Sequence, residues 1–163
     1  MIEIAILYVL NKHDATIYRL GKIIEEYFFA YLKTSTGTIN PALKRLADLG
    51  CVEYFEKMSD GGMLSKTYQI TKTGKLHLVD LLLSFESKNP YHIVNDAKIA
   101  LCATDVLSIN ELVEFKENLL NHLQLHKIKL ENGLKNEYIN ITKIQKKTVE
   151  ITIEEIEKLI KLL

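Results

Sequence analysis

The stretch that decides the fold is STGTINPALKRLADLG, at residues 35–50. Ser35 is a residue type that caps helix N-termini, and Gly50 suits the left-handed conformation that follows a helix C-terminus. Between them apolar residues recur at helical spacing, so one face of the helix must turn toward a core. The stretch therefore predicts an amphipathic helix that ends at about Leu49 and packs through Ile39, Leu43 and Leu46.

The opposite face of this helix has side chains suited to DNA recognition. Short hydroxyls and a glycine allow close approach to DNA, Asn40 can pair bidentately with adenine, and Lys44 and Arg45 can bind phosphate or guanine. Pro41 costs little in a helix that begins at Thr36, because it then lies near the first turn. On pattern alone, an ordinary surface helix is an equal alternative. The predicted DNA contacts here are Ser35, Thr36, Gly37, Thr38, Asn40, Pro41, Lys44 and Arg45.

Two helices are predicted ahead of this segment. Residues 2–10 are almost continuously apolar, which indicates a buried first helix. Asp14 or Thr16 can cap a second helix that reaches about Phe29. The apolar positions of that second helix recur at helical spacing and are Ile17, Leu20, Ile24, Tyr27 and Phe28.

A β-hairpin is predicted after Gly50. Residues 51–56 and 66–70 are rich in β-branched and aromatic residues, and Asp60-Gly61-Gly62 lies between them. Glycine supplies the positive φ that tight hairpin turns require. Three helices followed by a hairpin is the order of a winged helix-turn-helix. Lys66 on this wing is predicted to reach DNA, and a solvated hairpin is the alternative.

The second half of the chain is predicted to be helical. A fourth helix starts at residues 71–74 and carries Leu76, and the loop-like cluster at residues 87–90 marks a domain boundary. We expect a winged helix-turn-helix at residues 1–87 and a helical dimerisation domain, with a possible effector site, at residues 91–163. The fold class is therefore mainly α with a small β-hairpin wing. Its later helices are expected at about 92–104, about 108–131 and up to Leu163.

The last two helices carry apolar stripes that need a partner. The middle helix has a stripe from Ile109 to Leu130, and the last helix keeps alternating three-four spacing, which is a packing seam. Residues 138–153 are rich in β-branched residues, so an isolated helix there would be weak. Packing against another subunit is the predicted remedy. The predicted dimer contacts are Leu119, Leu123, Val149, Ile156, Leu159 and Leu163.

Composition indicates a globular cytoplasmic protein. The chain is 47% hydrophobic and 26% charged, with a formal net charge of zero. Two basic islands, residues 33–47 and 57–75, can still form a basic face. Neither a signal peptide nor a transmembrane segment is predicted, so no membrane partner is expected. Cys51 and Cys102 are expected to be buried thiols.

The sequence gives weaker support for metal binding, catalysis or cofactor binding. His122 and His126 are four positions apart, which is metal-ligand spacing, but no third ligand completes a site in the sequence. No catalytic constellation and no cofactor motif is present, so we expect neither an enzyme nor a cofactor or metal protein. A small-molecule effector, if bound, is expected near His92, Phe115, His126 and Ile156.

Residues 35–50 and the run KTYQITKTGK at residues 66–75 resemble the PadR family of bacterial transcriptional regulators. Tyr18 also fits that family's second-helix pattern and joins the predicted DNA contacts, and the similarity covers about residues 2–86. The remainder resembles the longer PadR subfamily, whose helical arm ends in a helix that packs across a homodimer. The resemblance implies a dimeric repressor that binds a pseudo-palindromic operator in double-stranded DNA and releases it on a signal.

Two positions depart from the family pattern. Asn40 stands where the family usually has tyrosine, which favours a base contact over a phosphate contact. The chain has no tryptophan, whereas members that stack flat aromatic drugs use one near the position of Ile156. Two alternatives remain: a winged helix that binds proteins, which zero net charge favours, and a ligand or metal sensor that acts through the arm.

Overall fold

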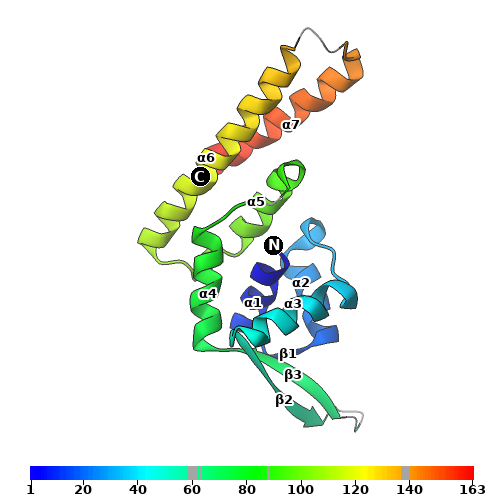
Figure 1. The fold of residues 1–163 in the computed structure, drawn as a ribbon, viewed down its shortest axis with the longest axis vertical. Helices are drawn as coiled ribbons and strands as arrows, with labels where there is room; N and C mark the ends of the chain where they lie inside the picture. The colour runs from blue at the N-terminus through cyan, green and yellow to red at the C-terminus, as the bar shows by residue number, and fades with distance from the viewer. Residues whose placement is uncertain (59–61, 63, 88, 137–139) are drawn as a thin grey trace.

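The computed structural model describes residues 1–58, 62, 64–87, 89–136 and 140–163. The molecule is elongated, with a winged helix at one end and a long helical hairpin at the other (Figure 1). The predicted fold class, mainly helical with a small β-wing, is confirmed. The elements are α1 (Ile2–Lys12), β1 (Ala15–Thr16), α2 (Ile17–Tyr27), α3 (Thr36–Asp48), β2 (Val52–Met58), β3 (Leu64–Ile70), α4 (Lys72–Leu83), α5 (Ile93–Cys102), α6 (Ile109–Leu134) and α7 (Lys143–Leu162).

Helix α1 is the centre of the winged helix. Every side chain from Ile4 to Leu10 is buried, and the helix packs against α2, α3, α4 and β3. It ends where His13 turns into an extended conformation. The predicted buried first helix is therefore confirmed and is two residues longer than expected.

Hydroxyl side chains cap the N-termini of α2 and α3. Thr16 rather than Asp14 caps α2, since its Oγ1 accepts a hydrogen bond from the Arg19 amide at 3.4 Å. Helix α2 stops at Tyr27, short of the predicted end, and the chain turns at Phe29, whose φ is 50°. The predicted second helix is thus present but shorter.

The wing is part of a three-stranded antiparallel sheet with strand order β1-β3-β2. Its hairpin register runs from the pair Val52 and Ile70 to the pair Met58 and Leu64, so both strands are longer than predicted. Strand β1 was not predicted, because it is two residues long and forms by pairing with β3. Asp60 and Gly61 of the predicted turn lie outside the described residues, and Gly62 has the positive φ expected of it, 74°.

Helix α4 starts in close contact with the end of α3. The Thr71 hydroxyl donates to the Gly50 carbonyl at 2.6 Å and accepts from the Gly74 amide at 3.0 Å. A Cβ atom on Gly74 would lie 2.0 Å from the Cys51 carbonyl oxygen, so only glycine fits there. The predicted apolar position Leu76 is exposed. The buried positions of this helix are Gly74, Leu78 and Leu82.

The later helices pack directly onto the winged helix. The Asn118 amide of α6 donates to the carbonyls of Leu83 at 2.9 Å and Phe85 at 3.2 Å, and the rings of Phe85 and Phe115 meet edge to face. Lys12 pairs with Asp105 at 2.7 Å. A continuous apolar core joins the two halves, and the division near residues 87–90 stays a prediction.

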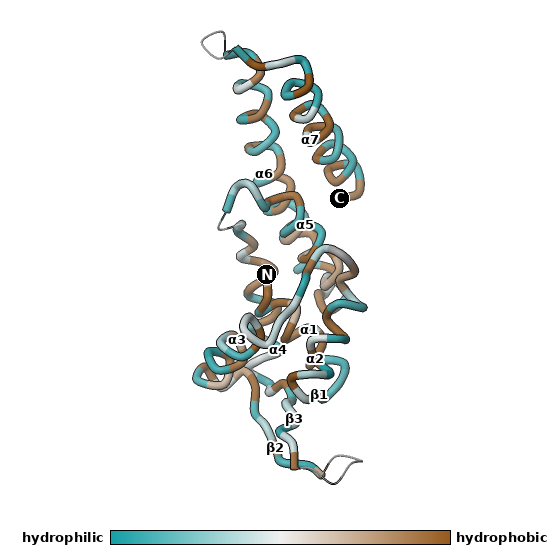
Figure 2. Tube along the Cα trace, turned by 90° about the vertical axis from the view of Figure 1, so that its right-hand side faces the viewer, coloured by the Kyte–Doolittle hydropathy of each residue, from teal (hydrophilic) through white to brown (hydrophobic). Residues whose placement is uncertain are grey.

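Helices α6 and α7 form an antiparallel hairpin, and apolar and polar residues alternate along both helices (Figure 2). Lys127 of α6 pairs with Glu157 of α7 at 2.6 Å. Leu119, Leu123, Ile156 and Leu159 of the predicted seam are already buried within the single chain, and their role as dimer contacts stays a prediction. Val149 and Leu163 are half-buried, and Ile109, at the start of the predicted stripe, is exposed.

None of the helices in the described ranges is long and apolar enough to cross a membrane. Both cysteines are free, and Cys51 is buried as expected, whereas Cys102 is half-buried. Burial raises the pKa of both thiols.

The tight approach at Gly74 predicts a large effect of adding one methyl group. Gly74→Ala should lower the free energy of unfolding by about 1–3 kcal/mol or more, because the Cys51 carbonyl cannot yield without moving the backbone. Gly133→Ala in α6 is the matched control, since its Cβ would meet nothing within 4 Å. Urea unfolding of both variants measures the difference. Equal stability of the two variants would show that the contact is not tight.

Candidate nucleic-acid interface

The outer face of α3 is small, polar and exposed. Of the predicted contacts, Ser35, Thr36, Gly37, Thr38, Asn40, Pro41, Lys44 and Arg45 are all exposed. A Cβ atom on Gly37 would meet nothing closer than the Ser35 Oγ at 3.6 Å. The fold therefore does not require glycine there, and the missing side chain matters only for what lies outside the protein.

Two of the predicted contact hydroxyls hold the start of α3. The Ser35 Oγ accepts from the Thr38 amide at 3.3 Å, and the Ser35 amide donates to the Thr38 Oγ1 at 3.0 Å. This is a capping box in which threonine takes the place of the usual acid. Pro41 lies in the second turn and has no N–H, so it donates no hydrogen bond to the Gly37 carbonyl.

Arg45 is directed toward α1. Its Nη2 lies 2.8 Å and its Nε 2.9 Å from Oε1 of Glu3, while 57% of its side chain stays exposed. The two residues are 42 positions apart, so the sequence pattern gave no sign of the pair. Lys44 is therefore the α3 cation that lies on the same side as Asn40.

A hollow of about 340 Å³ separates α3 from the hairpin, and two tyrosines that the sequence analysis missed lie on its wall. Tyr54 of β2 and Tyr68 of β3 stand opposite one another in the register, with ring centroids 5.8 Å apart. Cross-strand partners share one face of a sheet, so an exact register would have revealed the pair. The hollow is lined by Ile17, Asn40, Leu43, Lys44, Ala47, Tyr54 and Tyr68.

Lys66 extends this surface along the wing. Its Nζ lies 4.1 Å from the centre of the Tyr54 ring, and the interaction with Tyr54 raises the pKa of Lys66. Tyr18 on α2 is exposed and has the Lys22 Nζ 4.6 Å from its ring centre. Lys66 and Tyr18, which were both predicted to contact DNA, therefore each take part in an aromatic–cation pair at the protein surface.

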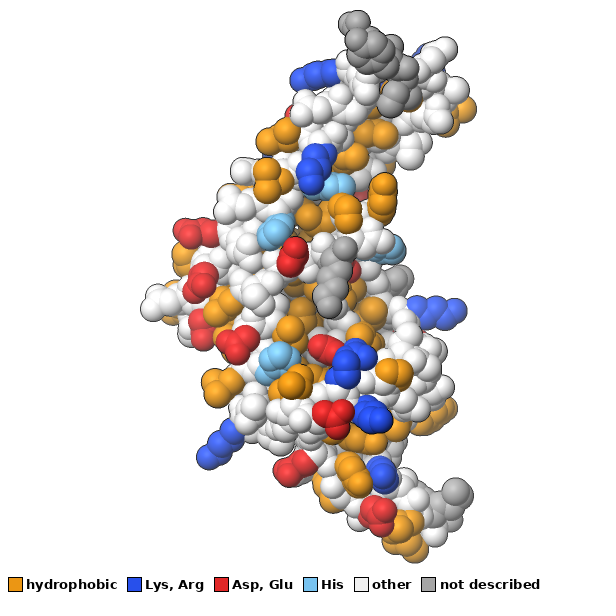
Figure 3. Space-filling model, viewed as in Figure 1, with side chains coloured by type: hydrophobic (Ala, Val, Ile, Leu, Met, Phe, Trp, Pro, Cys, Tyr) orange, Lys and Arg blue, Asp and Glu red, His pale blue; other side chains and the backbone are white. Residues whose placement is uncertain are grey.

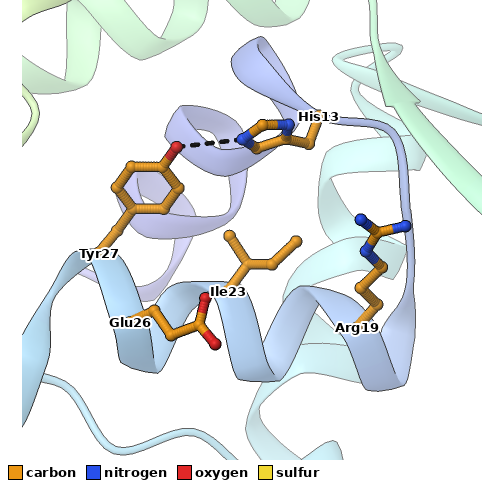
Figure 4. Close-up of a pocket in the computed structure, with 5 residues that line it drawn as sticks. All are labelled: His13, Arg19, Ile23, Glu26 and Tyr27. Carbon is orange, nitrogen blue, oxygen red and sulfur yellow. Dashed lines mark hydrogen bonds between the residues drawn. The ribbon is translucent and has the colours of Figure 1, made fainter.

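A second shallow pocket lies beside α2 (Figure 4). His13 and Tyr27 are joined at one end by a 3.0 Å hydrogen bond, and Arg19 lies at the other end. Ile23 and Glu26 complete the lining. The pocket is open and uses none of the predicted site residues.

The four predicted effector residues are not brought together. Phe115 and Ile156 are fully buried. His126 is half-buried on α6, where burial, and then the nearby Lys129, lowers its pKa. His92 lines a hollow of about 610 Å³ at the junction of winged helix and arm. That hollow is lined by Met1, Ile2, Glu3, Ile4, Arg45, Leu81, Ser84, Glu86, Asn89, His92 and Asp96.

The histidine pair of α6 does not gather metal ligands. The His122 ring meets the Phe85 ring edge to face, with centroids 6.0 Å apart. Within the described part of the chain, no three His, Cys, Asp or Glu side chains cluster closely enough to hold a metal ion.

Comparison with known proteins gives one family match. The model of the transcriptional regulator PadR-like family matches residues 6–80. None of the curated proteins matches the chain. The chain is similar to a transcriptional regulator from Thermoplasma acidophilum, with 29% identity over 49% of this chain and 75% of that one and a TM-score of 0.44.

Bacillus subtilis PadR is similar over nearly the whole chain. Its structure in complex with operator DNA is 17% identical, over 98% of this chain and 92% of that one, with a TM-score of 0.48. Its complex with p-coumaric acid is 17% identical, over 98% and 89%, with a TM-score of 0.41. The family consists of transcription regulators, which are normally not enzymes. The family match runs from α1 into α4, so this part of the chain is similar to the transcriptional regulator PadR-like family.

Proposed function

We propose that the protein is a cytoplasmic, non-enzymatic repressor that binds a pseudo-palindromic operator as a homodimer and releases it when a small molecule binds. The observation that carries the proposal is the outer face of α3, where exposed Asn40 and Lys44 border one hollow beside the wing. A lean polar helix face next to a lysine-bearing hairpin suits a major groove flanked by phosphates.

The two α3 side chains have different roles in this proposal. Asn40 reads a base, because its amide can donate to and accept from the edge of adenine. Lys44 holds phosphate and contributes affinity without sequence information. Arg45 is paired with Glu3 and therefore contributes less to DNA affinity than its position in the sequence suggests.

The separate roles predict separate effects on DNA binding. Lys44→Ala should weaken binding to all sequences and reduce the salt dependence by about one released counterion. Asn40→Ala should relax sequence preference, with a loss of about 1–3 kcal/mol on the specific site only. Fluorescence anisotropy over a salt series, on the promoter beside the protein's own gene and on random DNA, measures both.

Two outcomes would refute parts of this assignment. Equal loss by Asn40→Ala on specific and random DNA would remove Asn40 as a base reader. A wild-type protein that binds neither DNA at low salt would favour the alternative, a winged helix that binds another protein.

We propose that the dimer contact lies on the outer face of α7. Ile144, Ile151 and Leu162 are exposed, and at 100° per residue they fall within about 20° of one line along the helix. The buried seam faces α6 and is a quarter turn away from that line. Hydrophobic side chains are also exposed over the hairpin in Figure 3. An unpaired apolar line on a helix suits the same line of a second copy.

One substitution on that line should break the dimer. Ile151 is 56% exposed, so Ile151→Asp should leave the monomer folded and weaken association by about tenfold or more, since a carboxylate would be buried against the partner. Lys161→Asp, exposed on another side of α7, is the control. Analytical ultracentrifugation measures both variants, and an unchanged dimer of Ile151→Asp would contradict this surface.

We propose that the effector binds in the junction hollow that His92 lines. Side chains from α1, α3, α4 and α5 meet there, so an occupant would touch both the winged helix and the arm. Two DNA half-sites must stay about one helical turn apart, so a small change at this junction can end binding at one of them.

A phenolic acid is the first probe, because p-coumaric acid is bound by Bacillus subtilis PadR. It should raise the melting temperature of the wild-type protein and release its DNA, whereas His92→Ala should bind DNA normally and respond less. Thermal shift and anisotropy measure the two effects. Unchanged melting and unchanged DNA binding in the wild-type protein would contradict control by a phenolic acid.

A further inference from the structure

We propose that the hollow between α3 and the hairpin seats one sugar–phosphate strand of the bound DNA, held by the hydroxyls of Tyr54 and Tyr68. The inference rests on the proposed function, in which α3 occupies the major groove. It adds two binding residues on the wing that neither the sequence pattern nor the family match assigns.

The placement follows from the geometry of the two elements. A helix in the major groove and a wing at the neighbouring minor groove are separated by one strand of the duplex, because the backbone forms the wall between the grooves. That strand must pass between α3 and the hairpin. The hollow is the space between them, since Asn40 and Lys44 line one side and Tyr54 and Tyr68 the other.

The lining matches the chemistry of a sugar–phosphate strand. Ile17, Leu43 and Ala47 give an apolar floor, on which a deoxyribose can rest. Lys44 on one wall and Lys66 beyond the other supply positive charge for the phosphates. An apolar floor between two cations suits an alternating chain of sugars and phosphates better than it suits a flat apolar ligand.

The tyrosines are held in place before DNA arrives. Their rings pack against each other across the strands at 5.8 Å, with the planes at 50°. Tyr68 also stands opposite buried Ala15 of β1, so the central strand fixes its backbone on both sides. No hydrogen bond joins the Tyr68 hydroxyl to another residue in the described ranges, which leaves it as a donor for a phosphate oxygen.

Packing within the hairpin is the competing explanation for the pair. Replacement by phenylalanine separates the two explanations, because it keeps the ring and removes only the hydroxyl. Tyr54→Phe, Tyr68→Phe and the double variant should therefore melt like the wild type. Tyr91→Phe is the matched control, since Tyr91 is 92% exposed and lies in the turn before α5.

The first measurement is affinity for the promoter fragment and for random DNA over a salt series. The double variant should bind both DNAs about tenfold more weakly, because phosphate contacts carry no sequence information. The salt slope should stay unchanged, since a neutral hydroxyl releases no counterion. Tyr91→Phe should bind like the wild type. A double variant that binds as tightly as the wild type overturns the proposal.

The second measurement is ethylation interference, which neutralises one phosphate at a time. Wild-type binding should be blocked at the phosphates between the major-groove contact and the wing, and the block should weaken at those phosphates in the double variant. An unchanged interference pattern with lower affinity would mean a structural effect and would also overturn the proposal. Failure of the wild-type protein to bind any DNA would instead refute the proposed function itself.

Discussion

The burial of α1 is the constraint on which the rest of the structure depends. Its side chains from Ile4 to Leu10 are all buried, and a buried aliphatic side chain contributes about 1.5–3 kcal/mol. The charged residues at its ends reach outward, Glu3 to Arg45 of α3 and Lys12 to Asp105 beyond α5. Such partly exposed pairs contribute about 0–1 kcal/mol. Apolar burial therefore fixes the position of α1, and the ion pairs add only a small stabilisation to its contacts with neighbouring elements.

Features set by neighbouring residues were predicted well from the sequence. The Ser35 cap, the left-handed Gly50 and the hairpin after it all follow from signals within a few positions. Features set by distant residues were not. Strand β1 exists only through its pairing with β3, and the Arg45 pair depends on how α1 crosses α3. The missed tyrosines depend on a register that residue types alone do not determine.

The arm shows what periodicity can and cannot tell. The three-four spacing of α7 correctly indicated a buried face, and Ile156 is fully buried. Periodicity does not say which helix covers that face, and here α6 of the same chain does so. An outer line through Ile144 and Ile151 was overlooked, because polar residues surround it and the inner seam gave the stronger signal. A helix with two apolar lines can pack within its own chain and still meet a second copy.

The junction between arm and winged helix is built from packing contacts and hydrogen bonds. The Asn118 amide bonds to the last carbonyls of α4, whose first turn is in turn locked against the end of α3 by Thr71 and Gly74. A rotation of α6 would act on α4, which packs against α1 and whose capping Thr71 bonds to the loop at Gly50. Both of these support α3. The orientation of the outer face of α3 is thus coupled to the arm through close packing. Because close-packed interiors transmit small displacements, a movement of side chains at the junction by tenths of an ångström can reach α3.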